Sequence, residues 1–171
     1  MRFKPVPEPP AERTVLATIQ RALPATAGDV DDCCRLLLAE TALETRDEAA
    51  TWLTFLRALE LATEEPAGFR RRDAGSGSAL DSDRLRRAFR ARVDGADAVL
   101  GVLERADGPL TADEVAEAIR SERRQSGDRD RRPTRSVETQ RERIERLLEW
   151  AALLELAEQE RDGYRIAPAR E

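Results

Sequence analysis

The chain contains no histidine, and of its 29 basic residues only Lys4 is a lysine. Histidine is the side chain that most often transfers protons near neutral pH, so the commonest general acid or base is missing. No glycine-rich phosphate loop follows a strand, and "GSGS" at residues 75–78 is too short for a dinucleotide site. We therefore expect a protein with no enzyme activity, no catalytic residues and no bound cofactor.

Cysteine is nearly absent too, because Cys33 and Cys34 are the only two. Neighbouring helical residues point about 100° apart, so a disulfide between them would be strained. Two thiols without other soft ligands do not make a zinc site. We expect both to be small apolar residues on a partly buried helix, with no metal site; a redox switch is the alternative.

Long apolar runs are also missing, and aromatic residues make up only 4% of the chain. No apolar stretch approaches the roughly 20 residues of a membrane span, and "MRFKPVPEPP" lacks the apolar centre of a secretory signal. The sequence therefore predicts a cytoplasmic protein without a membrane partner. Hydrophobic residues make up 40% of the chain and fall in periodic runs, which favours a folded globule. Four prolines in the first ten residues predict an extended arm over residues 1–10.

Charge is abundant, at 37% of the chain, with a small surplus of acids. The 28 arginines and Lys4 stand against 34 acids, for a net charge of −5; near-absence of lysine with surplus acid is typical of a salt-adapted or GC-rich source. In molar salt the screening length falls to roughly 3 Å, so long-range attraction to a partner would be weak. Binding of a partner would then depend more on close, hydrogen-bonded contacts.

One segment occurs twice. "LELATEEPAGFR" at residues 59–70 returns as "LELAEQERDGYR" at residues 154–165, an offset of 95. Upstream, "VLATIQRA" and "VLGVLERA" align at an offset of 84, and Thr26 aligns with Thr111 at an offset of 85. Three blocks in the same order indicate a duplicated domain.

Each repeat is predicted to be three helices and a hairpin. The first helix buries Val15, Leu16, Ile19 and Leu23 in one copy and Val99, Leu100 and Leu103 in the other. The second helix opens at Thr26 or at Thr111, where "TADE" is a full capping box. The third opens at a second box, "TRDE" from Thr45, or at Ser136.

The third helix is expected to carry the largest buried stripe and to run straight into the hairpin. The predicted core residues are Trp52, Leu53, Phe55, Leu56 and Leu59, matched by Leu147, Leu148, Trp150, Ala151 and Leu154. A type I turn at residues 65–68 closes the first hairpin, and Asp162-Gly163 reverses the second. Between the repeats, helical spacing from Leu85 to Leu103 continues through Gly95, so a connector helix extends or precedes the later first helix.

This pattern resembles the winged-helix superfamily over about residues 11–72 and 95–167, and the whole chain, including "DDCCRLL" and "TWLTFLRALEL", is similar to a tandem-repeat family from halophilic archaea. The expected fold is mainly α, with two winged-helix repeats. The expected segments are an arm (1–10), repeat 1 (11–72), a linker and connector helix (73–94), and repeat 2 (95–168) with an arginine-rich insertion (120–135). The resemblance implies a DNA-associated regulator, because the third helix of such proteins commonly enters the major groove and the wing touches phosphates.

The charge on the exposed faces of the two third helices bears on the implied contact with DNA. The exposed face of the later third helix is predicted to be acidic, with Glu138, Glu142, Glu145, Arg146 and Glu149. The corresponding face of the first copy, with Asp47, Ala50, Thr51, Thr54 and Ala58, is small and nearly uncharged. Neither face is typical of base reading.

Positive charge gathers beside these helices instead, with a net +5 over residues 70–92 and +4 over residues 120–135. We predict phosphate contacts at thirteen arginines of these segments. They are Arg70, Arg71, Arg72, Arg84, Arg86, Arg87, Arg90, Arg92, Arg123, Arg124, Arg131, Arg132 and Arg135.

The competing hypothesis is a protein-docking adaptor or dimerising scaffold that does not bind DNA. In that case the arginines balance acidic faces of their own fold or of a dimer mate. The smooth face of Thr51, Thr54 and Ala58 would then contact a protein partner or a second copy.

Overall fold

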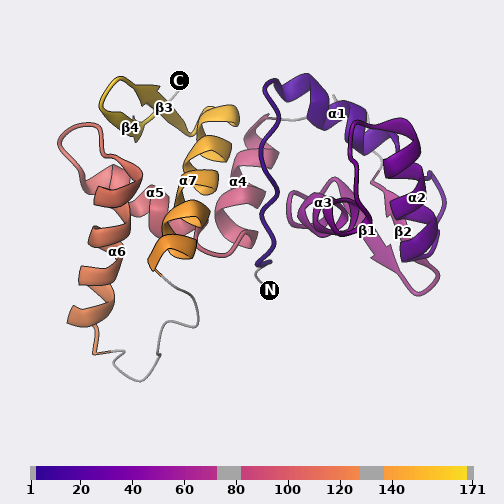
Figure 1. Cartoon of the computed structure of the whole chain (residues 1–171), viewed down its shortest axis with the longest axis horizontal. Coiled ribbons are helices and arrows are strands. Elements are labelled where there is room, and N and C mark those ends of the chain that lie inside the picture. Colours follow the sequence, from indigo (N-terminus) through magenta and orange to yellow (C-terminus); the bar gives the residue numbers. More distant parts are fainter. Residues whose placement is uncertain (1–2, 73–81, 128–136, 169–171) are drawn as a thin grey trace. The chain divides into compact units, whose positions relative to one another are not determined.

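The computed structural model describes residues 3–72, 82–127 and 137–168. The chain divides into two compact units, Met1–Asp94 (unit 1) and Gly95–Glu171 (unit 2). Unit 1 contains α1 (Arg13–Arg21), α2 (Val30–Glu40), α3 (Arg46–Ala58), β1 (Ala62–Glu65), β2 (Gly68–Arg71) and α4 (Ser82–Arg92). Unit 2 contains α5 (Ala96–Arg105), α6 (Ala112–Gln125), α7 (Val137–Leu153), β3 (Ala157–Glu160) and β4 (Gly163–Ile166). The predicted order of three helices and a hairpin is confirmed in both units (Figure 1).

The two repeats match most closely where the third helix ends. Glu60 and Glu155 both have φ of 61°, the left-handed conformation that stops a helix. The next backbone N–H turns back in both copies, from Leu61 to the Leu56 carbonyl and from Leu156 to the Ala151 carbonyl, each at 2.8 Å. Residues that lie 95 apart in the sequence therefore have the same backbone geometry at this junction.

The third helices carry the core that was predicted for them. Phe55 and Trp150 are fully buried, and the Trp52 ring meets Phe55 edge-on with centroids 6.2 Å apart. The other predicted stripe residues, Leu53, Leu56, Leu59, Leu147, Leu148, Ala151 and Leu154, are all buried. The third helix is thus the central element of each unit.

The first helix of unit 1 departs from its prediction at one residue. Leu16, Ile19 and Leu23 are buried, whereas Val15 is 39% exposed. The buried stripe passes instead through Gln20, 2% exposed, whose Nε2 donates to the Leu61 carbonyl at 3.2 Å. Gln20 follows Leu16 by four residues and so shares its face, whereas Val15 points about 100° away. The satisfied amide makes the buried polar residue tolerable.

The predicted start of the second helix at Thr26 is wrong. The helix begins after Asp29, whose side chain accepts from the Asp32 N–H at 2.7 Å. It starts late because Gly28 first pairs with Phe69 of β2, through N···O distances of 2.9 and 2.7 Å. A single-residue β-bridge to the wing therefore precedes the helix.

Unit 2 has the same pairing between Leu110 and Tyr164 of β4, at 2.8 and 2.7 Å, and α6 follows at once. Its predicted capping box between Thr111 and Glu114 is confirmed. Since Gly28 matches Leu110, the second helices correspond at an offset of 82. The offset of 85 inferred from sequence is therefore wrong at this block.

The other capping predictions have mixed outcomes. The Thr45 hydroxyl accepts from the Glu48 N–H at 3.1 Å, as expected. The Glu48 carboxylate, however, accepts from the Glu44 N–H at 3.2 Å, one residue before the cap, so the second box is incomplete. The predicted start at Ser136 lies outside the described residues.

The hairpins, called the first wing (β1–β2) and the second wing (β3–β4), share one register. Glu65 pairs with Gly68 across Pro66-Ala67, as predicted. In the second wing Glu160 pairs with Gly163, so Arg161-Asp162 forms the turn and the predicted Asp162-Gly163 reversal is wrong by one residue. Gly163 instead opens β4, because its φ of 137° and its contact with the Leu110 backbone require a residue without Cβ.

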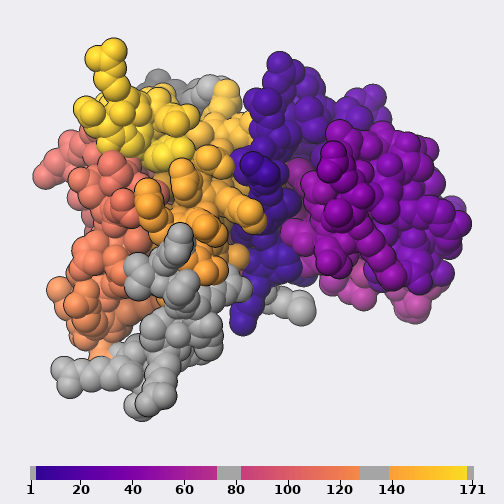
Figure 2. Space-filling view, in the orientation of Figure 1, coloured from indigo at the N-terminus to yellow at the C-terminus, as the bar shows by residue number. Residues whose placement is uncertain are grey.

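The connector helix precedes the later first helix and does not extend it. α4 ends at Arg92 because Val93 leaves the helix to pair with Phe3, through Phe3 N–H to the Arg92 carbonyl at 2.7 Å and Asp94 N–H to the Phe3 carbonyl at 2.9 Å. Phe3 and Val6 are buried. Figure 1 shows the indigo N-terminal segment passing between α3 and α4, and Figure 2 shows that segment in the same orientation. The four-segment division of the chain stays a prediction. None of the described helices is both long and apolar enough to cross a membrane.

Replacing Gly68 by alanine should destabilise unit 1 by about 2 kcal/mol or more. Its φ is 131°, and an added Cβ would overlap the Gly28 carbonyl. Gly108→Ala is the control, because a Cβ there meets nothing within 4 Å. The free energy of unfolding from urea titration measures both changes. Equal values for the two variants would contradict the proposed backbone constraint.

Candidate nucleic-acid and protein interfaces

Three of the arginines predicted to contact phosphate converge on one carboxylate in unit 1. Glu60 is approached by Arg72 at 3.8 Å, Arg84 at 3.4 Å and Arg92 at 3.3 Å. They come from the end of the first wing and from both ends of α4. All four side chains remain 31–41% exposed. Three guanidinium charges thus surround one carboxylate at the solvent boundary; we call these four residues the Glu60 cluster.

The other two arginines of the first wing also fold back onto unit 1. Arg70 pairs with Glu65 across the hairpin and donates to the Arg71 carbonyl at 3.2 Å. Arg71 donates to the Arg21 carbonyl, at the C-terminus of α1, at 3.3 Å. These contacts fix the direction of both guanidinium groups, and Arg71 also faces the negative end of a helix dipole.

The remaining arginines of α4 do not join the Glu60 cluster. Arg86 pairs with Asp83 at 3.3 Å and Arg90 is half-buried. Arg87 is exposed and forms no ion pair with the described residues. Its side chain is the most accessible of the predicted phosphate contacts on this helix.

The second basic segment is only partly described. Arg123 is exposed in the last turn of α6, and Arg124 pairs with Glu117 at 3.0 Å. Arg131, Arg132 and Arg135 lie outside the described residues. This segment therefore adds one exposed and one paired arginine to the described surface.

The proposed partner face on α3 is smaller than the sequence suggested. Ala58 is fully buried, in the last turn before the buried reversal into the wing, so its assignment to an exposed face is wrong. Thr51 and Thr54 are half-buried, and their hydroxyls donate to the Asp47 and Ala50 carbonyls at 2.9 and 3.1 Å. These hydroxyls are occupied by their own helix and offer little to base edges.

The outer face of α7 is acidic at the positions that the structure describes. Glu142, Glu145 and Arg146 are exposed and Glu149 is half-buried, while the side chain of Glu138 lies outside the described residues. Burial raises the pKa of Tyr164 on the second wing, and the nearby Glu149 and Glu145 raise it further. The negative potential of α7 therefore reaches the wing beside it.

Sequence reasoning missed an aromatic contact of the N-terminal residues. The Arg57 guanidinium lies 5.2 Å from the Phe3 ring centroid and 5.3 Å from that of Phe69, and it pairs with Glu64. Arg92 lies 5.2 Å from the Phe3 centroid. Such cation–π contacts anchor Phe3 between α3 and α4. Phe3 is the one aromatic residue in the proline-rich start, and this feature of the sequence could have indicated the contact.

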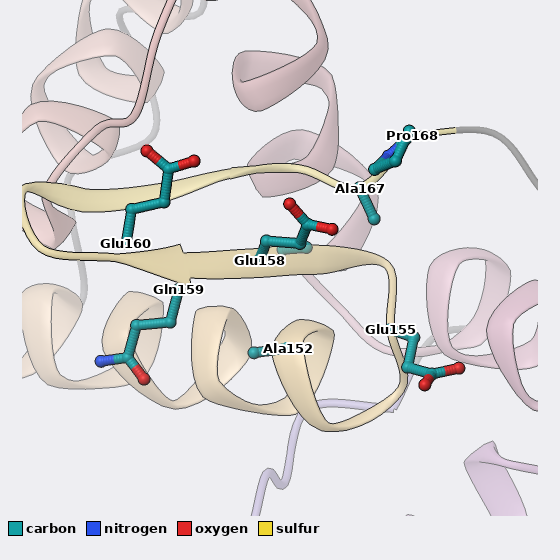
Figure 3. Close-up of a pocket in the computed structure, with 8 residues that line it drawn as sticks. Ala152, Glu155, Glu158, Gln159, Glu160, Ala167 and Pro168 are labelled. Atoms are coloured by element: carbon teal, nitrogen blue, oxygen red, sulfur yellow. The ribbon is translucent and has the colours of Figure 1, made fainter.

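The second wing borders an open pocket of about 490 Å³ (Figure 3). Glu158 and Glu160 project to one side of β3, Gln159 projects to the other, and Glu155 marks the turn from α7. The complete lining is Ala152, Glu155, Ala157, Glu158, Gln159, Glu160, Ala167 and Pro168. It combines small apolar residues with three carboxylates and contains no basic residue.

The two cysteines are buried and free. The Cys33 thiol lies 3.6 Å from the Gly28 and Phe69 carbonyls, and burial raises the pKa of both thiols. At the corrected offset of 82 their counterparts in unit 2 are Val115 and Ala116, which are also buried. This supports the interpretation of both thiols as core residues. The described part of the chain brings no three metal-ligating side chains together.

Comparison with known proteins identifies the family. The family model described as "Halobacterial double winged helix domain" matches residues 1–171, and the chain belongs to this family. The tandem winged-helix fold expected from the sequence is thereby confirmed. No curated protein and no solved structure gives a significant match.

Stability should decrease with rising pH in the alkaline range. The pKa of each cysteine is raised above its ordinary 9.0 on folding, so its contribution is present below about pH 9 and is lost as the thiols ionise. The double change Cys33→Val and Cys34→Ala, which copies unit 2, should reduce this loss between pH 8 and 10.5 in urea titrations. The pKa of Tyr164 is raised as well, so its ionisation lowers stability in the same direction, and part of the loss should remain in the variant. An identical loss in the variant would contradict the role given to the thiols.

Proposed function

We propose that this member of the double winged helix family is a non-enzymatic, DNA-associated regulatory protein that contacts phosphates through the first wing and α4. The carrying observation is the Glu60 cluster, in which three guanidinium groups share one carboxylate at the solvent boundary. Exposed ion pairs contribute only about 0–1 kcal/mol, so phosphate oxygens can compete for these arginines. Glu60 keeps them oriented before DNA arrives.

The place of this cluster in the fold supports the same proposal. Winged-helix proteins commonly use the wing for phosphate contacts, and Arg72 directly follows β2 of the first wing. Arg71 and the exposed Arg87 belong to the same elements, β2 and α4. The second wing ends instead in Ile166 and Ala167, beside three carboxylates of the pocket. Unit 1 is therefore the better candidate for contact with the DNA backbone.

Base reading by the third helices is not part of the proposal. The Thr51 and Thr54 hydroxyls bond their own helix, and α7 exposes Glu142 and Glu145. Carboxylates on this face would repel phosphate as the helix approached the groove. The proposed contact is accordingly with the backbone, and its affinity should depend strongly on salt.

The double change Arg71→Ile and Arg72→Ala tests this, because it gives the first wing the residues of the second. DNA affinity at low salt should fall at least tenfold. The slope of log K against log salt should fall by about 0.9 for each phosphate that the variant no longer neutralises. Fluorescence anisotropy with a labelled duplex measures both.

Arg141→Gln with Arg146→Gln is the matched control, since it removes two exposed arginines from α7. We expect it to change DNA affinity less than the wing variant does. A larger effect of the control would point to the third helix of unit 2. An unchanged salt slope in the wing variant would overturn the assignment of the first wing.

A protein-docking role without DNA is the second candidate, favoured by the acidic surface of α7 and the small half-buried Thr51 and Thr54 on α3. If α3 forms such an interface, Thr54→Arg should place an unpaired charge in it and lower the oligomeric mass measured by light scattering. Thr14→Arg, at an exposed position on α1, adds the same charge elsewhere. Equal masses for the wild type and both variants would exclude dimerisation through this face.

A further inference from the structure

The aromatic ring of Phe3 lies against one arginine of the Glu60 cluster. The Arg92 guanidinium is 5.2 Å from the Phe3 ring centroid and 3.3 Å from the Glu60 carboxylate. Phe3 and Arg92 are also joined through the backbone, because the Phe3 N–H donates to the Arg92 carbonyl at 2.7 Å. Phe3 is 6% exposed, whereas the side chain of Arg92 is 33% exposed. A buried ring therefore holds a guanidinium group that still reaches solvent.

Further contacts of the N-terminal segment fix the ring in place. The Phe3 carbonyl accepts from the Asp94 N–H at 2.9 Å, so Phe3 is bonded to the backbone on both sides of Val93. Val6 and Pro7, farther along the segment, are buried as well, and Figure 1 shows this segment passing between α3 and α4. Proline has a fixed φ, which restricts the backbone here. The ring is thus held independently of the arginine that it contacts.

The two arginines at this ring depend on it to different degrees. Arg57 also lies 5.3 Å from the Phe69 ring centroid and pairs with Glu64, so it keeps two partners when the N-terminal ring is removed. In the described part of the chain, Arg92 is then left with the Glu60 carboxylate, which two other arginines share. Loss of the ring should therefore release Arg92 more than Arg57.

We infer that Phe3 is a positioning residue of the phosphate-contacting surface, because its ring holds the Arg92 guanidinium beside Arg72 at the end of the first wing. This rests on the proposed function and adds the N-terminal segment to the surface formed by the first wing and α4. Phosphates are regularly spaced along a DNA strand, so arginines must match them in position. An arginine that is already held in place loses less side-chain freedom when it binds.

The change Phe3→Leu tests the ring. Leucine keeps an apolar side chain and both backbone hydrogen bonds but offers no π face to the guanidinium. DNA affinity of the full chain at low salt should fall about fivefold, measured by fluorescence anisotropy with a labelled duplex. Phe3→Met, which also lacks a ring, should show the same loss. Phe3→Tyr restores the π face and should bind within about twofold of the wild type. Thermal unfolding of each variant confirms that it is folded.

A double-mutant cycle separates positioning of Arg92 from a general effect on stability. In an Arg92→Gln background, Phe3→Leu should have no further effect on DNA affinity, because the guanidinium that the ring holds is absent. Arg87→Gln is the matched control background, since Arg87 carries the same charge at an exposed position on the same helix. There Phe3→Leu should keep its fivefold effect.

The inference is overturned if Phe3→Leu and Phe3→Met bind DNA as the wild type does, or if Phe3→Tyr binds as weakly as they do. Equal losses from Phe3→Leu with and without Arg92 would overturn it too, because the ring would then act through stability alone. In each of these cases the proposed function stands as long as Arg71→Ile with Arg72→Ala lowers DNA affinity. A wild type that does not bind DNA would overturn both.

Discussion

The left-handed residue at the end of each third helix is the constraint on which the rest of the fold depends. Glu60 and Glu155 stop the helix and turn the chain so that the next residue bonds back to the preceding turn. This reversal sets the direction of the wing, and the wing then pairs with Gly28 or Leu110 to fix the start of the second helix. A different backbone conformation at this residue would displace both strands of the wing and the second helix.

The same constraint places a carboxylate at an equivalent point in each unit, and the neighbouring residues decide its use. In unit 1, Arg72 and the arginines of α4 surround Glu60. In unit 2, Ala167 replaces the arginine and a pocket opens beside Glu155. The two units therefore share one backbone geometry at this point and differ in the side chains around the glutamate.

The internal partners of the arginines also explain why the winged-helix fold alone does not show which residues contact a binding partner. Arginine outnumbers every other cation in the chain, yet the arginines of the first wing and most of those on α4 point toward acids or carbonyls of their own unit. Such pairs contribute little stability at the surface, but they hold guanidinium groups in fixed directions. Orientation by internal acids suits close contacts in high salt, where long-range attraction is screened.

The sequence by itself determined the duplication, the order of elements and the buried stripes of the third helices, because identical segments and helical periodicity are local properties of the chain. It also located the hairpins at residues 65–68 and near Gly163. Only the tertiary structure decided that the second helix starts after Asp29, since the pairing of Gly28 with Phe69 joins residues far apart in sequence. For the same reason the sequence could not show that Phe3 ends α4, that Ala58 is buried, or that three arginines meet at Glu60. The number of charged residues can be counted from the sequence, but which acid pairs with which arginine is set by contacts between distant segments.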